Sequence, residues 1–405
     1  MRSYAFVGAG NRGTYMYAVP ISRDYGDIAR IVGVYDTNAK RSSLLKQRTG
    51  GQFPVYEDFA GMLAEGKPDV VIVTSVDSTH HTYIVQALQA GCDVITEKPL
   101  TIDEEKCRLI LDAERRTGKQ VTVTFNLRYM PFMGRLKEMA GEAALGTITH
   151  VHFEWFLDTK HGADYFRRWH RRKANSGGLL VHKSTHHFDI VNWVLEDEPA
   201  DVHAFGSTRY YGPTRKERGA RCYGCSYAGS CEFYMDSREG SAKLLYADCE
   251  DEDGYYRDSC VFADEIDIED SVSLTARYAR GALMSYSLTA YSPYEGFRIV
   301  ITGTKGRLEA EYLDGSIGPY AGQTVQSMRL IGRGGAVVEI PLAEETGGHG
   351  GGDERLLRAL LVGSDGSDSR QASSRDGALS CAIGFAANRS IREGRSVRIA
   401  DLNLF

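Results

Sequence analysis

Short apolar runs alternate with amphipathic segments along residues 1–125. The runs are rich in β-branched residues and have the length of strands. The segment 78–91 has a helical pattern and ends at Gly91, a residue type that commonly terminates helices. Strands that alternate with helices are typical of a parallel, doubly wound sheet. The five apolar runs are 3–10, 30–36, 69–75, 93–99 and 120–126.

From residue 126 onward the apolar pattern becomes longer and alternates with polar residues, as in 148–157 and 270–291. Two further stretches of this kind, 297–313 and 326–342, contain turn-like glycines. Alternation of this kind predicts strands with one buried face. We therefore expect an α/β protein with two parts. Residues 1–125 form a Rossmann domain, and residues 126–405 form an α/β domain with a large open, mostly antiparallel sheet.

The composition agrees with two soluble domains. The chain has 405 residues and a net charge of −6, which gives no reason to expect a nucleic acid or membrane partner. A basic segment at 167–173 is too short to change this in an acidic protein. No apolar run approaches the length of a membrane span, and the N-terminus runs directly into a strand-like segment, so we expect a cytoplasmic protein.

The first apolar run ends in a glycine-rich turn, G-x-G-x-x-G, formed by Gly8, Gly10 and Gly13. Placed between a strand and a helix, this pattern is typical of a turn that binds a dinucleotide pyrophosphate. Asp36 ends the second run and could accept a hydrogen bond from a ribose hydroxyl. A carboxylate there favours NAD over NADP, while Arg41 nearby leaves NADP as the alternative, and a turn without a ligand is the simplest other reading.

Lys98 lies between Glu97 and Pro99 in a second short motif. Together with the segment 8–13 and the stretch 125–131, this motif resembles the Gfo/Idh/MocA oxidoreductase family across essentially the whole chain. The resemblance implies a nicotinamide cofactor, a sugar or polyol substrate, and a second domain that often forms the oligomer contact. We therefore expect a homodimer or a homotetramer.

The resemblance also assigns roles to individual residues. Lys98 matches the family lysine between nicotinamide and substrate, and His80 and Asn126 match positions that border the cofactor. The residues expected to bind the cofactor are Gly8, Gly10, Asn11, Arg12, Gly13, Asp36, Thr74, His80, Glu97, Lys98 and Asn126.

A histidine-rich stretch at 177–193 contains His182, His186 and Asp189 at helical spacing. Under the resemblance, His186 falls on the family histidine and Asp189 on its later aspartate, whereas His182 stands where the family has an aspartate. We expect Lys98, His186 and His182 to be catalytic. A metal site and a structural polar seam are the alternatives for this stretch.

The segment 158–173 is dense in aromatic and cationic residues of the kind that bind sugars. The residues expected to bind substrate are Arg128, Tyr165, Arg167, Trp169, His182, Lys183 and His186. A glycine loop at 347–357 is interpreted as a mobile cover or a linker, with Asp353 as a helix N-cap.

A cysteine cluster lies in an apparent insertion at about 215–262. Cys222, Cys225 and Cys231 have the spacing of a metal knuckle, and we expect Cys260 to complete a structural zinc site. An iron–sulfur cluster, free thiols and a local disulfide are the alternatives. The acidic run 248–270 is interpreted as a solvated loop.

These observations favour an NAD(P)-dependent dehydrogenase that oxidises a secondary hydroxyl of a sugar, glycoside or cyclitol. A redox-neutral lyase or hydrolase that passes through a keto-sugar is the first alternative. A sensor that binds dinucleotide and sugar without turnover is the second.

Overall fold

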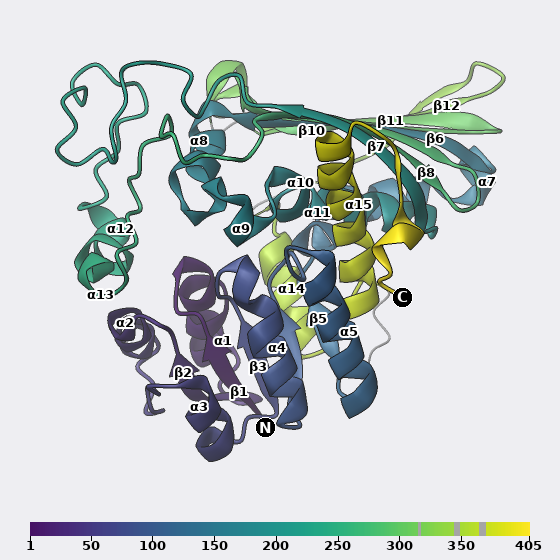
Figure 1. Ribbon diagram of the computed structural model, residues 1–405. Helices are drawn as coiled ribbons and strands as arrows, with labels where there is room; N and C mark the ends of the chain where they lie inside the picture. Colours follow the sequence, from purple (N-terminus) through teal and green to yellow (C-terminus); the bar gives the residue numbers. More distant parts are fainter. Residues whose placement is uncertain (315–316, 344–348, 364–369) are drawn as a thin grey trace.

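The computed structural model describes residues 1–405 except 315–316, 344–348 and 364–369. Two sheets organise the molecule, with helices between and around them (Figure 1). The first sheet has the strand order β14-β5-β4-β3-β1-β2, and the second has the order β13-β12-β11-β10-β6-β9-β8-β7-β15. The first is parallel except for its β14 edge, and the second is mostly antiparallel, which confirms the predicted fold class.

The first sheet is built from short strands that are almost entirely buried, as expected for a parallel sheet covered on both faces. Its strands are β1 (Arg2–Val7), β2 (Ala29–Tyr35), β3 (Val70–Val73), β4 (Asp93–Thr96), β5 (Val121–Val123) and β14 (Ala372–Ser373). The helices around it are a π-helix η1 (Arg12–Ala18), α1 (Val19–Asp24), α2 (Ala39–Thr49), α3 (Phe59–Gly66), η2 (Asp77–Thr79), α4 (His80–Gln89), α5 (Glu104–Thr117) and η3 (Asn126–Tyr129).

Strand β14 lies far along the chain from the strand that it pairs with. Ala372 pairs antiparallel with Val123 of β5, so the second part of the chain supplies an edge strand to the first sheet. Helix α15 then starts with a capping box between Ser373 and Asp376. The division at residue 125 therefore stays a prediction, and the two parts of the chain share a sheet.

The second sheet has one buried and one open face. Strands β8 and β9 alternate between buried and more exposed positions, which is the pattern that the sequence showed. Its strands are β6 (Ile148–Asp158), β7 (Pro199–Ser207), β8 (Ser271–Tyr278), β9 (Leu283–Ser292), β10 (Glu295–Gly303), β11 (Gly306–Asp314), β12 (Val325–Gly332), β13 (Val337–Glu339) and β15 (Val397–Arg398). The expected turns near 279–281 and 304–306 join antiparallel neighbours.

Helices pack on one face of this sheet, among them α11 and α15 (Figure 1). The helices of this part are α6 (Pro131–Met139), α7 (Glu142–Leu145), α8 (Thr159–Arg167), η4 (Trp169–Arg171), α9 (Lys173–Ser176), α10 (Leu179–His182), α11 (Thr185–Leu195), α12 (Gly240–Leu245), η5 (Ala247–Cys249), α13 (Glu250–Asp253), η6 (Gly318–Tyr320), α14 (Gly352–Leu361), α15 (Ser374–Glu393) and η7 (Ile399–Leu402).

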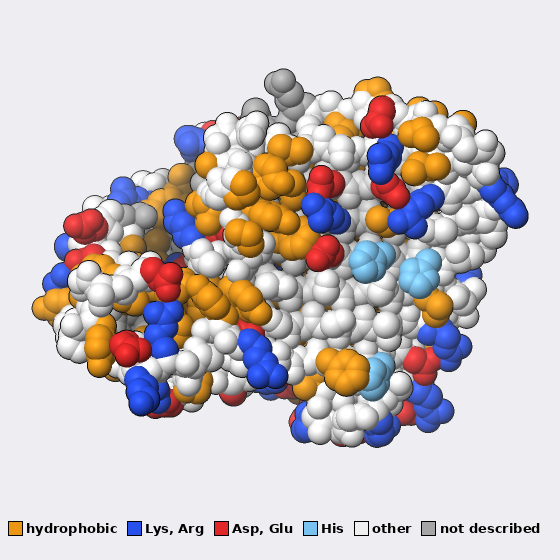
Figure 2. All heavy atoms as spheres, turned by 90° about the horizontal axis from the view of Figure 1, so that it is seen from above, with side chains coloured by type: hydrophobic (Ala, Val, Ile, Leu, Met, Phe, Trp, Pro, Cys, Tyr) orange, Lys and Arg blue, Asp and Glu red, His pale blue; other side chains and the backbone are white. Residues whose placement is uncertain are grey.

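The opposite face of the second sheet is uncovered in the described part of the chain. Figure 2, which views the molecule from above, shows hydrophobic side chains in patches among charged and other polar groups. Phe205 of β7 and Leu283 of β9 are exposed by 69% and 44%. Large apolar side chains that stay exposed on a sheet face are candidates for contact with another chain.

No described helix is long and apolar enough to cross a membrane.

Candidate active site

The glycine turn after β1 requires glycine for steric reasons. Gly8 has a φ of 94°, and a Cβ atom there would lie 2.6 Å from backbone atoms of Thr74 and Ser75. A Cβ atom on Gly13 would lie 2.4 Å from the Gly8 carbonyl oxygen. A Cβ atom on Gly10 would meet nothing within 4 Å, so this glycine faces open space. The turn thus brings bare backbone to the start of a helix, which is the geometry that receives a pyrophosphate.

Asp36 is held rigidly at the end of β2. Its carboxylate accepts hydrogen bonds from the backbone N–H groups of Ala9, at 2.6 Å, and Asn38, at 2.8 Å. Burial raises the pKa of Asp36, and these two hydrogen bonds oppose that effect. The carboxylate lines a cavity of about 520 Å³ that also includes Gly10 and Thr74. This placement fits the predicted contact with a ribose.

Arg12 belongs to an ion-pair network beside the glycine turn. Its Nε lies 2.7 Å from the Glu97 carboxylate, and its terminal nitrogens lie 3.1 Å from Asp353. The same Asp353 accepts a hydrogen bond from the Asn126 amide at 2.7 Å. Asp353 was expected to cap a helix, but the N-cap of α14 is Gly351, and Asp353 pairs with Arg12 instead. The network fixes three predicted cofactor residues to one another.

Two other predicted cofactor residues lie behind the cavity wall. Gly13 packs against Gly8, and His80 is fully buried. The His80 ring nitrogens lie 2.9 Å from the Pro99 carbonyl oxygen and 3.2 Å from that of Ser75. His80 therefore supports the turn on which Ser75 lies, and it does not line the cavity.

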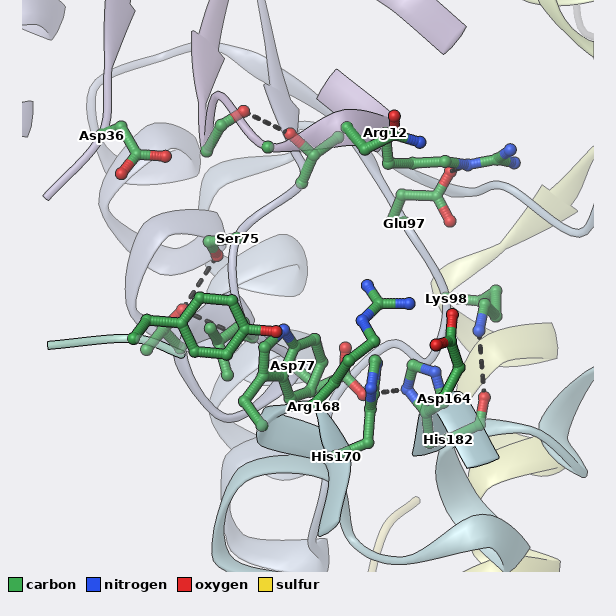
Figure 3. Close-up of a pocket in the computed structure, with 18 of the residues that line it drawn as sticks. Arg12, Asp36, Ser75, Asp77, Glu97, Lys98, Asp164, Arg168, His170 and His182 are labelled. Carbon is green, nitrogen blue, oxygen red and sulfur yellow. Dashed lines mark hydrogen bonds and ion pairs between the residues drawn. The ribbon is translucent and has the colours of Figure 1, made fainter. Parts of the chain in front are cut away.

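Lys98 lies at the opposite end of the same cavity from Asp36 (Figure 3). Its Nζ donates a hydrogen bond to the backbone carbonyl of His182 at 3.1 Å. Burial lowers the pKa of Lys98 to about 8, and the Asp77 carboxylate opposes this shift. The lysine therefore links the carboxyl end of β4 to the histidine-rich stretch.

His182 forms a pair with Asp77, a residue that the sequence analysis did not select. The Asp77 carboxylate lies 2.5 Å from Nδ1 of His182, and both side chains are buried. The His170 ring lies 4.0 Å from the His182 ring, centroid to centroid. Burial lowers the pKa values of His170 and His182, so both rings are neutral near pH 7. The sequence feature that could have identified Asp77 as a site residue is its position shortly after the buried strand β3.

The expected single helix through His182, His186 and Asp189 is wrong. Helix α10 ends at His182 and α11 begins at Thr185, because the N–H groups of Lys183 and Ser184 both bond to the Leu179 carbonyl. The three side chains therefore do not form one row on a continuous helix.

The His186 ring lines the first cavity, and one of its nitrogens is without a partner in the described part of the chain. Its Nδ1 is buried and has no hydrogen-bond partner among the residues that the structure describes. The ring lies edge-on to Phe125, with centroids 5.9 Å apart. Burial lowers the pKa of His186 well below its ordinary value, and the charge of Lys98 adds to this effect. A neutral imidazole with a free nitrogen is a proton acceptor.

Asp189 pairs with Arg128 and does not reach the cavity. Two hydrogen bonds of 2.8 and 2.6 Å join the Arg128 guanidinium to the Asp189 carboxylate, and both side chains are buried. Arg128 also bonds to Asp376 at 3.2 Å. The Arg128 donors join η3, α11 and α15, and the contact of Arg128 with substrate stays a prediction.

A second cavity, of about 1030 Å³, adjoins the first. Lys183 and His186 line both cavities. Of the other predicted substrate residues, Tyr165 and Trp169 line the first cavity and Arg167 lines the second. The Arg167 guanidinium is already engaged, since it donates to the Phe233 carbonyl at 3.1 Å.

The insertion covers the Asp36 end of the first cavity. Arg41 of α2 pairs with Asp253 of α13 at 2.5 Å, and the rings of Tyr246 and Tyr255 lie 5.8 and 5.7 Å from its guanidinium. Asn38 donates a hydrogen bond to the Cys249 carbonyl at 2.9 Å. The interpretation of 248–270 as a solvated loop is therefore wrong for its first turn, which docks on the Rossmann domain.

The structure does not assemble the predicted zinc site. Within the described ranges, no group of three or more His, Cys, Asp or Glu side chains is placed to hold a metal ion. The Cys222 sulfur lies 3.8 Å from the Phe233 carbonyl oxygen, and Cys225, Cys231 and Cys260 are free thiols. The backbone N–H of Cys260 donates to the Ala220 carbonyl at 3.0 Å, which is a strand-like contact. The alternative metal site in the stretch 177–193 is not assembled among the described residues either, because Asp189 pairs with Arg128.

Two family models match most of the chain. A family model described as an oxidoreductase family with an NAD-binding Rossmann fold, GFO_IDH_MocA, matches residues 2–125. The model of the C-terminal alpha/beta domain of that family matches residues 137–399.

Among curated proteins, the chain is 38% identical to the oxidoreductase YteT of Bacillus subtilis, over 99% of each chain. It is 30% identical to the D-glucoside 3-dehydrogenase of Escherichia coli, over 41% of this chain and 46% of the relative. Inositol 2-dehydrogenase of Rubrobacter xylanophilus is 27% identical over 44% of this chain and 48% of its own.

Solved structures share the fold at low identity. An NAD binding oxidoreductase from Klebsiella pneumoniae matches with a TM-score of 0.71 and 16% identity, over 98% of both chains. An oxidoreductase from Agrobacterium radiobacter, solved with NAD+, L-tartaric acid and magnesium, matches with a TM-score of 0.66 and 17% identity over 99% of both chains.

Proposed function

Because the chain belongs to the Gfo/Idh/MocA oxidoreductase family, we propose that it is an NAD-dependent dehydrogenase that oxidises a secondary hydroxyl of a sugar, glycoside or cyclitol. One observation carries this proposal. Lys98 and the His186 ring line the same cavity as the glycine turn. A dinucleotide site and a proton acceptor therefore lie in one continuous space.

The residues divide the work of alcohol oxidation between them. NAD+, when bound, supplies the acceptor for the hydride. The His186 imidazole takes the hydroxyl proton, since the ring is neutral near pH 7. Lys98, in its protonated form, donates a hydrogen bond to the same oxygen and stabilises its developing negative charge. His182, held by Asp77, orients the substrate from the other side.

The preference for NAD over NADP rests on two carboxylates. Asp36 is fixed at the ribose end and repels a 2′-phosphate. Arg41, the cation that could bind such a phosphate, is neutralised by Asp253 at 2.5 Å. The pairing of Arg41 with the insertion therefore supports NAD over NADP.

A redox-neutral cleavage through a transient keto-sugar is the second candidate. Elimination beside a carbonyl needs a second group that can give or take a proton. The Asp77–His182 pair, which lies next to His170, can serve as that group. This arrangement stands in place of the single aspartate implied by the family pattern.

Incubation of the full-length protein with NAD+ and a panel of sugars, glycosides and inositols tests both candidates. Steady formation of NADH supports the dehydrogenase. Cleavage products without net NADH support the second candidate, and binding without turnover of any panel member would overturn both in favour of a sensor.

We further propose that the protein is a homodimer or homotetramer formed through the open face of the second sheet. The exposed Phe205 and Leu283 side chains on this face support the proposal. Light scattering at micromolar concentration tests it, and a monomer mass would contradict it.

A further inference from the structure

Lys183 occupies an unusual position at the junction of the two cavities. It lies between α10 and α11, is only 8% exposed, and lines both cavities together with His186. Its Nζ lies 4.9 Å from the centre of the Trp155 ring. The ammonium group is therefore buried near the point where a substrate that gives its proton to His186 would lie.

This ammonium group has no anionic partner. Among the residues that the structure describes, no carboxylate lies within ion-pair distance of Lys183. Glu295 is the acid that favours its charged form, but the oxygens of Glu295 accept hydrogen bonds from Asp158 and His161, at 2.8 and 3.1 Å. Burial lowers the pKa of Lys183.

Other acids of the second cavity wall are also engaged elsewhere. Asp158 caps helix α8 by accepting from two backbone N–H groups. Asp164 pairs with Arg257 at 2.9 Å, and Glu232 pairs with Arg215 at 2.9 Å. These acids therefore do not supply a countercharge to Lys183.

A buried ammonium without an anion is costly, and such groups are retained mainly where a ligand completes them. We propose that the substrate is an acidic sugar, of the uronate or aldonate class, and that Lys183 binds its carboxylate. This inference rests on the proposed dehydrogenase function. A carboxylate carries the single charge that one lysine balances. The volume of about 1030 Å³ leaves room for a sugar acid and a further substituent.

Calorimetric titration of the NAD-loaded protein with matched acid and neutral sugars tests the inference. The probes are D-glucuronate against D-glucose and D-galacturonate against D-galactose. We expect the acid of at least one pair to bind at least about tenfold more tightly, as for a hydrogen bond between charged groups. Lys183→Met, and Lys183→Gln as a second variant, should remove this ratio.

Lys137→Met is the matched control, because Lys137 also lies 4.9 Å from a tryptophan ring but outside both cavities. It should keep the wild-type ratio. Equal or weaker binding of the acids in the wild-type protein, or a ratio that survives in both Lys183 variants, would overturn the inference. Tighter binding of glucose 6-phosphate than of glucuronate would overturn it in favour of a sugar phosphate. NADH formed from neutral sugars alone would leave the dehydrogenase intact while refuting the acidic substrate.

Discussion

Nδ1 of His182 lies 2.5 Å from the carboxylate of Asp77, although 105 residues separate them in the chain. The contact joins the carboxyl end of a Rossmann strand to the helix that begins the catalytic stretch. It places a carboxylate behind an imidazole at a position where the family pattern implies a carboxylate alone. The carboxyl group of the site thus lies behind His182, on the segment that follows β3.

Asp77→Asn should therefore keep the shape of the pair but remove its charge. We expect turnover to fall by about tenfold or more, and the pH profile to change, because an amide does not titrate and cannot share a proton with His182. Steady-state kinetics across pH measure both effects. Asp112→Asn, on the exposed face of α5, is the control. An unchanged pH profile in Asp77→Asn would assign the pair a packing role.

Lys98→Ala and His186→Ala should each lower turnover by at least about a hundredfold, as for the loss of an acid–base or electrostatic group. Binding of NADH should survive, since neither side chain belongs to the glycine turn. Fluorescence titration and single-turnover kinetics separate the two effects. Near-normal turnover in His186→Ala would refute its role as the base. His182→Ala should lose less activity than either.

The pH dependence of kcat/KM should follow from Lys98 and His186. His186 must be neutral, and its lowered pKa keeps it so above about pH 6.5. Lys98 must be protonated, and with a pKa of about 8 it loses its proton above that pH. We expect kcat/KM to fall as the pH rises through about 8, and to fall in acid only below the ordinary histidine pKa. A flat profile between pH 7 and pH 10 would contradict this reasoning.

Asp253→Ser should shift cofactor preference toward NADP, because it frees the Arg41 guanidinium to bind a 2′-phosphate. We expect the ratio of kcat/KM for NADP to that for NAD to rise by about tenfold. Asp251→Ser is the matched control, since Asp251 pairs with Lys40 on the exposed side of the same helix. If both variants kept the wild-type ratio, Arg41 would have no part in cofactor selection.

Arg128→Met should destabilise the protein by about 3–5 kcal/mol, because it leaves the buried Asp189 carboxylate without its partner. Urea denaturation measures the loss. The double variant Arg128→Met/Asp189→Leu should recover part of it, since no uncompensated charge remains. A loss of activity without a loss of stability would instead support the prediction that Arg128 binds substrate.

The local features of this protein could be predicted from sequence alone. Gly8 and Gly13 are required by contacts of a few ångströms within one turn, and Asp36 follows its strand directly. The alternation along β8 and β9 reports which side of each strand is buried. Such signals lie within short windows, because backbone sterics and side-chain periodicity act between near neighbours.

The contacts between distant segments were decided only by the tertiary structure. The break between α10 and α11 places His182 and His186 on different helices. The burial of Arg128 against Asp189 gives a predicted substrate residue a structural contact. The pairs Asp77–His182 and Arg41–Asp253 join segments that lie far apart in the chain, and no sequence pattern connects the two members of either pair. Their partners are chosen by how the sheets and the insertion pack, since a buried charge takes whichever opposite group the fold brings within reach.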